Sequence, residues 1–166
     1  MTTVQPPVVD QAIFREVVGH FTTGVAVITT QAGDERFGVT ASAVSSLSLE
    51  PPMLLVCLHR RLPTCEALGA TRAFVVNILD EDQDELAMRF ATRQPDKFAG
   101  VPMGSSDLGI PLLADALAHL ECRLVERVDA GTHTVFIGEV QSARARPGGP
   151  LAYFRGSFGR FAARAA

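Results

Sequence analysis

Residues 38–58 read GVTASAVSSLSLEPPMLLVCL and carry the strongest indication of the fold. Residues 37–44 are strand-like and are typical of the second arm of a β-hairpin. The segment 46–52 ends that hairpin, because its two consecutive prolines cannot donate to a sheet ladder. Residues 53–59 are apolar at nearly every position, which predicts a strand that is buried on both faces.

Strands also dominate on both sides of this stretch. Upstream, 24–30 is β-branched, and a turn containing Gly and Asp joins it to 37–44. Downstream, apolar and polar residues alternate in 119–128, and 133–145 follows as a long strand in which Gly138 marks a bend or bulge. Further strands are predicted at 73–79 and, as one final strand, at 151–158.

Helical spacing of apolar residues occurs in three places. After Asp10, a candidate N-cap, Phe14 and Val17 belong to such a pattern that runs to residue 21. Thr64 is a candidate cap for a short helix within 60–70, and the segment 81–91 has the acidic first turn that a helix dipole favours. Residues 92–115 are rich in Gly, Pro, Asp and Ser, which predicts a long surface loop of the kind that often carries function.

Six or more strands joined mostly by hairpins, with helices at the margins, predict a mainly β fold, an antiparallel barrel that is closed or split. A doubly wound α/β fold is disfavoured, because no regular strand–helix alternation and no GxGxxG motif occur. The length of 166 residues suits a single domain, expected at 10–166 after a disordered N-terminal tail at 1–9.

Composition excludes several classes of protein. The net charge of −3 gives no basic footprint for nucleic acid. The three cysteines form no CxxC pair and predict reduced residues in or near the core rather than disulfides or a zinc site. The N-terminus lacks the pattern of a signal peptide, and no run of 18 apolar residues occurs, so a cytoplasmic protein without a membrane span is expected.

Candidate chemistry is confined to three places, because GxSxG, HExxH and Walker motifs are absent. The hydroxyl-rich run 38–52 suits close contact with a flat ligand, or is simply the polar exterior of a barrel. Arg60 and Arg61 before Thr64 suit a phosphate at a helix start, or form a solvated loop. His133 is a candidate catalyst, although a lone histidine is more often structural.

The stretch 38–58 resembles the flavin reductase family, which has the FMN-binding split-barrel fold and supplies the reductase components of two-component flavin-dependent monooxygenases. The resemblance continues in the family's order over most of 12–160. It runs through FTTGVAVITT (21–30), AFVVNIL (73–79), QDELAMRFA (83–91), DKFAG (96–100), PLLADALAHLEC (111–122), GTHTVFIGEV (131–140) and PLAYFRGSF (150–158).

The resemblance implies an NADH- or NADPH-dependent reductase of FMN or FAD that passes reduced flavin to a partner monooxygenase and forms a homodimer. It places His133 beside the nicotinamide as the catalytic residue. The implied cofactor-binding residues are Thr40, Ala41 and Ser42 at the flavin ring and ribityl chain, Ser45 and Ser46 nearby, Leu58, His59, Thr64, Lys97 and Phe98 near the ribityl phosphate, and Tyr153 and Arg155 on the terminal strand.

Two positions depart from the family pattern. Ser42 stands where Asn is frequent, and Thr132 replaces the Asp that precedes the family's His and that would orient it. Two other functions remain open. An oxidase of a pyridoxine phosphate would need more phosphate-gripping residues than Arg60 and Arg61, whereas a non-catalytic flavin-binding module would hold flavin but oxidise nicotinamide slowly.

Overall fold

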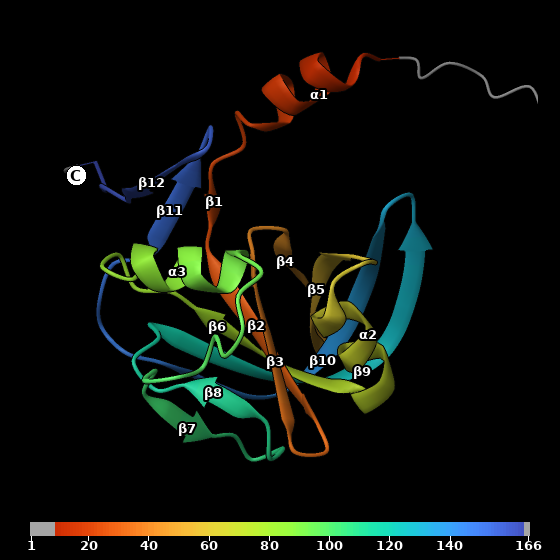
Figure 1. Cartoon of the computed structure of the whole chain (residues 1–166). Helices are drawn as coiled ribbons and strands as arrows, with labels where there is room; N and C mark the ends of the chain where they lie inside the picture. Colours follow the sequence, from red (N-terminus) through yellow and green to blue (C-terminus); the bar gives the residue numbers. More distant parts are fainter. Residues whose placement is uncertain (1–8, 165–166) are drawn as a thin grey trace, which may run out of the picture.

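The computed structural model describes residues 9–164, and strands make up most of it (Figure 1). The predicted tail at 1–9 lies outside the described residues except for Val9, which is exposed. Seven antiparallel strands form the main sheet in the order β3-β2-β6-β9-β10-β5-β4. Their bounds are Ala26–Ala32 (β2), Glu35–Ala41 (β3), Val44–Leu49 (β4), Pro52–His59 (β5), Ala73–Ile78 (β6), Ala118–Ala130 (β9) and His133–Ala145 (β10).

The sheet curls because its two edge strands, β3 and β4, are consecutive in the chain. Only Ser42 and Ala43 separate them, and the Cys57 backbone N–H donates to the Ala43 carbonyl at 2.9 Å. No ladder joins β3 to β4 within residues 9–164, so the curled sheet stays open along this seam. The predicted mainly β, antiparallel split barrel is confirmed, and its closed variant is excluded.

The residues around the seam correct one prediction. The single hairpin arm predicted at 37–44 is divided, since β3 ends at Ala41 and β4 begins at Val44. The segment 46–52, predicted to end a hairpin, instead contains most of β4 and the turn into β5. Pro52 is tolerated because it is the first residue of β5, where a missing N–H costs the ladder little.

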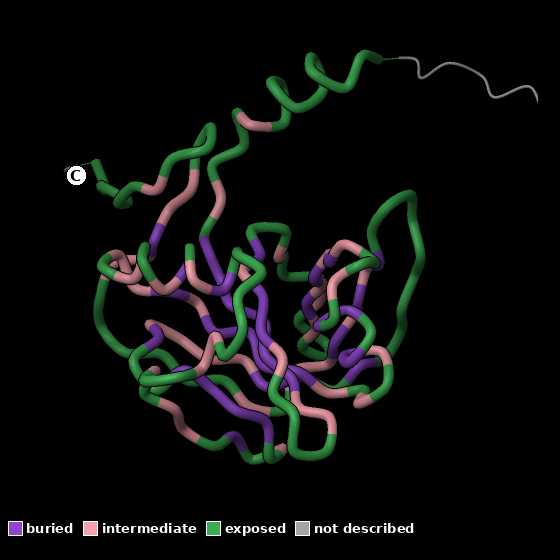
Figure 2. The backbone as a smooth tube through the Cα atoms, viewed as in Figure 1, coloured by how far each residue is buried: buried purple, intermediate pink, exposed green. Residues whose placement is uncertain are grey.

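The faces of β2 bury different parts of the core. Ile28 belongs to the cluster inside the curled sheet, with Phe74 and Phe136, whereas Val27 belongs to a second cluster with Phe90. All five of these side chains are fully buried, and each contributes roughly 1.5–3 kcal/mol by leaving water. Because core clusters pack against both faces of β2, five consecutive residues of this strand are buried (Figure 2).

Helices α2 (Pro63–Thr71) and α3 (Asp84–Ala91) pack on the sheet. Thr64 is not the cap of α2, contrary to the prediction, because Leu62 is the capping residue and Pro63 occupies the first helical position. Proline suits that position, since its fixed φ matches the helix and its missing N–H would have had no partner there. Thr64 is therefore buried in the first turn.

The predicted surface loop at 92–115 contains structure of its own. Strands β7 (Met103–Ser105) and β8 (Pro111–Leu113) form a hairpin whose side chains Ile110 and Leu112 are buried against Val75. Glu121, 1% exposed, holds the turn between them by accepting hydrogen bonds from the backbone N–H groups of Asp107 (2.8 Å) and Leu108 (3.3 Å). The prediction of a long surface loop is wrong for residues 103–113, because tertiary contacts order them.

The C-terminal strand predicted at 151–158 is also two strands. Strand β11 (Leu151–Phe154) turns at Arg155 and Gly156 into β12 (Ser157–Arg160), and both turn residues have positive φ, +48° and +84°. This is the geometry of a tight two-residue hairpin turn. The hairpin pairs with the short strand β1 (Thr23–Gly24) to form a separate three-stranded sheet.

Helix α1 (Gln11–Val18) begins as predicted at Asp10, whose carboxylate accepts from the Ala12 and Ile13 N–H groups. None of its residues is buried, and it projects away from the body of the molecule (Figures 1 and 2). The β9–β10 hairpin confirms its predicted form, with a register shift at Gly138. None of the helices within residues 9–164 is long and apolar enough to cross a membrane.

Candidate functional site

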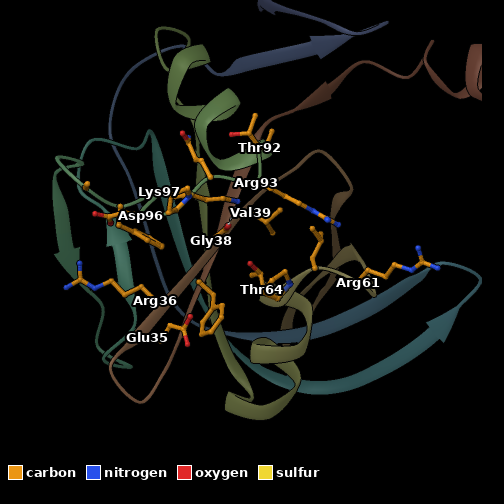
Figure 3. Close-up of a pocket in the computed structure, with 18 of the residues that line it drawn as sticks. Glu35, Arg36, Gly38, Val39, Arg61, Thr64, Thr92, Arg93, Asp96 and Lys97 are labelled. Atoms are coloured by element: carbon orange, nitrogen blue, oxygen red, sulfur yellow. Dashed lines mark hydrogen bonds between the residues drawn. The ribbon is translucent and has the colours of Figure 1, made fainter.

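A pocket of about 1000 Å³ opens between β3, the start of α2 and the segment after α3 (Figure 3). It gathers Thr64, Lys97 and Phe98 from the predicted site residues, together with Arg61. Sequence analysis missed two further basic lining residues, Arg36 and Arg93. Neither belongs to a motif, and only the folded chain brings them beside α2.

Lys97 fastens one wall of the pocket. Its Nζ atom donates hydrogen bonds to the carbonyl oxygens of Phe90 (2.9 Å) and Gly38 (3.3 Å), and burial lowers its pKa. Phe98 packs edge-on against Phe90, with ring centroids 5.1 Å apart. Lys97 and Phe98 therefore hold the segment after α3 against β3 and give the pocket a defined shape.

The opposite wall is suited to an anion. Pro63 has no N–H, and the N–H groups of Cys65 and Glu66 donate to the Leu62 carbonyl, so the first turn of α2 offers an anion the Thr64 N–H alone. Arg61 precedes this turn and Arg93 lines the same pocket, so their guanidinium groups add positive charge at the rim. Figure 3 shows Arg61 and Arg36 extending outward on opposite sides.

The hydroxyl-rich stretch continues from this pocket along β3 and into β4. Gly38 and Val39 line the pocket, and Ser42, Ser45 and Ser46 lie exposed further along the chain. Thr40 differs from these serines, because its hydroxyl donates to the Ala87 carbonyl at 2.6 Å and thereby holds α3 to the sheet. Ser42, Ser45 and Ser46 form the serine strip, in which the Ser45 hydroxyl donates to the Ser46 carbonyl at 3.1 Å.

Two predicted residues have side chains committed to packing. Ala41 is buried and Leu58 is 2% exposed in the cluster inside the curled sheet. Any contact from Leu58 to a ligand must therefore come from its backbone.

Tyr153 and Arg155 lie on the β11–β12 hairpin and do not line the pocket. The Tyr153 ring packs against Phe158 at 5.6 Å and joins the core cluster that also includes Phe98. Arg155 is exposed in the turn, and its backbone N–H donates to the Gly19 carbonyl at 3.2 Å. Tyr153 therefore shares a core cluster with the pocket residue Phe98, whereas Arg155 lies in the turn.

His59 and His133 face each other across β5 and β10. They are register partners, and their ring centroids are 5.2 Å apart at 70°. His133 Nδ1 is 2.9 Å from the Thr132 hydroxyl, so Thr132 occupies the orienting place that the family gives to Asp. His59 precedes the pocket residues Arg61 and Leu62, which places the pair beside the α2 wall.

Cysteine and metal chemistry find no support at this site. Cys57, Cys65 and Cys122 are free thiols, and burial raises the pKa of Cys122 to about 12. Within residues 9–164, no three His, Cys, Asp or Glu side chains gather as metal ligands would. The pocket, the serine strip and the histidine pair are thus suited to holding an organic anion with a flat, polar-edged part.

Comparison with known proteins gives a consistent result. A family model described as "Flavin reductase like domain" matches residues 18–162. The reductase component of 4-nitrophenol 4-monooxygenase/4-nitrocatechol 2-monooxygenase from Rhodococcus opacus is 49% identical over 152 residues, which cover 92% of this chain and 82% of that protein. "FMN reductase (NADH) SmoA" from Agrobacterium fabrum is 38% identical over 148 residues, 89% of this chain and 84% of that protein.

Among solved structures, the Streptomyces globisporus C-1027 NADH:FAD oxidoreductase SgcE6, in complex with NAD and FAD fragments, superposes with a TM-score of 0.89. The two sequences are 36% identical, and the match covers 97% of this chain and all of that one.

Proposed function

Because the chain belongs to the flavin reductase-like family, we propose that it is an NADH-dependent flavin reductase that supplies reduced flavin to a partner monooxygenase. The observation that carries this proposal is the pocket at the start of α2, which four basic and three acidic side chains line. The exposed serines and the histidine pair lie on chain segments adjoining those that line it. The names of the relatives support NADH as the donor, and they include both FMN and FAD as acceptors.

The residues present fit a flavin. The Thr64 N–H at the start of α2 and Arg61 would bind its phosphate, and the exposed Ser42, Ser45 and Ser46 would meet its polar ring edge. A bound flavin supplies the redox chemistry, since its ring takes up a hydride from the nicotinamide. Backbone amides near Thr40–Ser42 would stabilise negative charge on the ring's pyrimidine side.

His133 would position the nicotinamide rather than transfer a proton. Hydride transfer needs stacked rings at close approach more than it needs a protein acid. His133 is exposed, and its Nδ1 faces the Thr132 hydroxyl, which leaves Nε2 available to a ligand. In this role it would hold the nicotinamide or its amide group.

Helix α1 supports the proposal of a homodimer. Its side chains Phe14 and Val17 are 60% and 61% exposed, and Phe21 after it is 74% exposed. An eight-residue helix is marginal in water without tertiary packing, so its apolar face needs a partner. Nothing within residues 9–164 covers it, and Phe154 adds a further exposed aromatic ring beside His20. A second copy of the chain would bury both.

The decisive experiment measures NADH and NADPH oxidation by the purified protein with FMN, FAD or no added flavin. Turnover with NADH that depends on added flavin supports a reductase that releases its product. A protein that binds flavin tightly but oxidises NADH slowly would overturn the proposal in favour of the non-catalytic flavin-binding module. The NADPH arm decides whether the donor preference is strict.

A further inference from the structure

The two histidines beside the pocket are not held in equivalent ways. His59 is the last residue of β5 and His133 the first of β10, and the antiparallel register places them directly opposite. Their rings meet edge to face, with centroids 5.2 Å apart at 70°. Such a pair has a preferred geometry, so the position of one ring constrains the other.

Two hydrogen bonds from the loop that follows β5 hold His59 in place. The Arg61 backbone N–H donates to His59 Nδ1 at 3.1 Å, and the Leu62 N–H donates to the His59 carbonyl at 3.0 Å. Because Nδ1 accepts a hydrogen bond, the proton of the neutral ring resides on Nε2. His59 is also only half-buried, whereas the loop after it leads directly into α2.

The ring of His133 is held less firmly than that of His59. Among residues 9–164, the side chain that forms a hydrogen bond with it is the Thr132 hydroxyl, which lies on the exposed turn of the β9–β10 hairpin. A hydroxyl both donates and accepts, so unlike a carboxylate it selects neither tautomer nor a single ring orientation. The remaining contact that restrains the His133 ring is the His59 ring.

The backbones of the two segments are tied together, so this contact persists. The Arg60 N–H donates to the Thr132 carbonyl at 3.0 Å, and the Thr134 hydroxyl donates to Asp129 at 2.6 Å across the hairpin. The distance between the loop that follows β5 and the turn that precedes β10 is therefore fixed.

We infer that His59 is a positioning residue, which sets the ring orientation of His133 and through it the binding of the nicotinamide. This inference rests on the proposed function and reassigns His59 from the flavin phosphate to the nicotinamide side of the site. It also explains how a chain with Thr132 in place of the family's Asp can still orient its histidine.

Two substitutions at His59 distinguish the effect of its aromatic ring from the effect of its Nδ1 acceptor. His59→Phe keeps an aromatic ring beside His133 but loses the acceptor for Arg61 N–H, whereas His59→Asn keeps an acceptor and loses the ring. We expect His59→Asn to raise KM for NADH about 3- to 10-fold with flavin affinity within about 2-fold of wild type, and His59→Phe to raise it by less, since pair contacts of this kind amount to about 1 kcal/mol. Glu139→Ala, at the far end of the same strand pair, is the control for general damage.

A double-mutant cycle shows whether His59 acts through His133. In a His133→Ala background, His59→Asn should cause no further rise in KM. In the ligand-free protein, the ring protons of His133 should keep a ring-current shift in His59→Phe and lose it in His59→Asn. Equal effects of His59→Asn in both backgrounds, or a normal His59→Asn with a damaged His59→Phe, would overturn the inference. Absence of NADH oxidation in the wild type would instead count against the proposed function, while the resonance test would still report on the pair.

Discussion

Lys97 and Gly38 are joined by a hydrogen bond in which the lysine Nζ donates to the glycine carbonyl oxygen at 3.3 Å. The same ammonium donates to the Phe90 carbonyl at 2.9 Å. A lysine placed by resemblance at a flavin phosphate thus also has a structural task, since it holds the segment after α3 to β3. We therefore expect stability and flavin binding at this pocket to depend on the same side chain.

Replacement of Lys97 by Met should lower both stability and flavin affinity. The variant keeps the aliphatic chain but leaves two carbonyl oxygens without a donor, at a cost of about 1–3 kcal/mol. Urea unfolding measures the first effect, and quenching of flavin fluorescence measures the second. Arg93→Met is the matched control, for which we expect weaker flavin binding with stability within about 0.5 kcal/mol of wild type. A Lys97→Met protein as stable as wild type would contradict the structural task.

Gly38→Ala should destabilise the protein because there is no room for a methyl group. A Cβ at this position would lie 2.5 Å from Cε1 and 2.7 Å from Cδ1 of Phe90, a ring that is fully buried. Overpacking of this kind costs about 1–3 kcal/mol. Gly24→Ala, where nothing lies within 4 Å, should be nearly neutral. Thermal unfolding of both variants tests the contrast, and equal melting temperatures would refute it.

The buried thiol of Cys122 should make stability fall at high pH. Burial, with a smaller contribution from Glu121, raises the pKa of Cys122 to about 12 in the folded protein. The unperturbed thiol has a pKa of 9.0, so stability is fully present below that pH and is lost as pH rises toward 12. Relative to Cys122→Ala, the wild type should lose about 1.4 kcal/mol per pH unit within this window. Unfolding of both proteins at pH values of about 8 and 10 measures the difference, and parallel curves would contradict the prediction.

Val17→Asp on the apolar face of α1 should weaken the proposed homodimer. A charge placed in a buried interface costs several kcal/mol, whereas in the isolated chain the residue is 61% exposed and the change is tolerated. Light scattering over a dilution series should show dissociation at higher concentrations than for the wild type. Ala12→Asp, which adds the same charge on another side of the helix, is the control. A wild type that is monomeric at all concentrations would refute the dimer itself.

Several elements could be predicted from local sequence because local interactions determine them. Asp10 caps α1 through contacts two and three residues away, and the β9–β10 hairpin follows from alternation and a short turn, with its bulge at Gly138. The resemblance over most of the chain added the split-barrel fold and the reductase family. The predictions that failed, at 37–44, 46–52, Thr64, 92–115 and 151–158, required knowledge of tertiary contacts, of which backbone groups were already satisfied, or of a positive φ at Arg155.

Tertiary structure alone decided how the site is assembled. Arg36 and Arg93 are 57 positions apart in the chain, and they line one pocket only because α3 packs on β3. His59 and His133 face each other only because β5 and β10 pair in one register, and a shift by one residue would turn one ring to the other face. Periodicity and caps are properties of neighbours along the chain and are readable from it. Strand register and the contacts between the two walls of the pocket depend on the packing of the whole core, which no local pattern encodes.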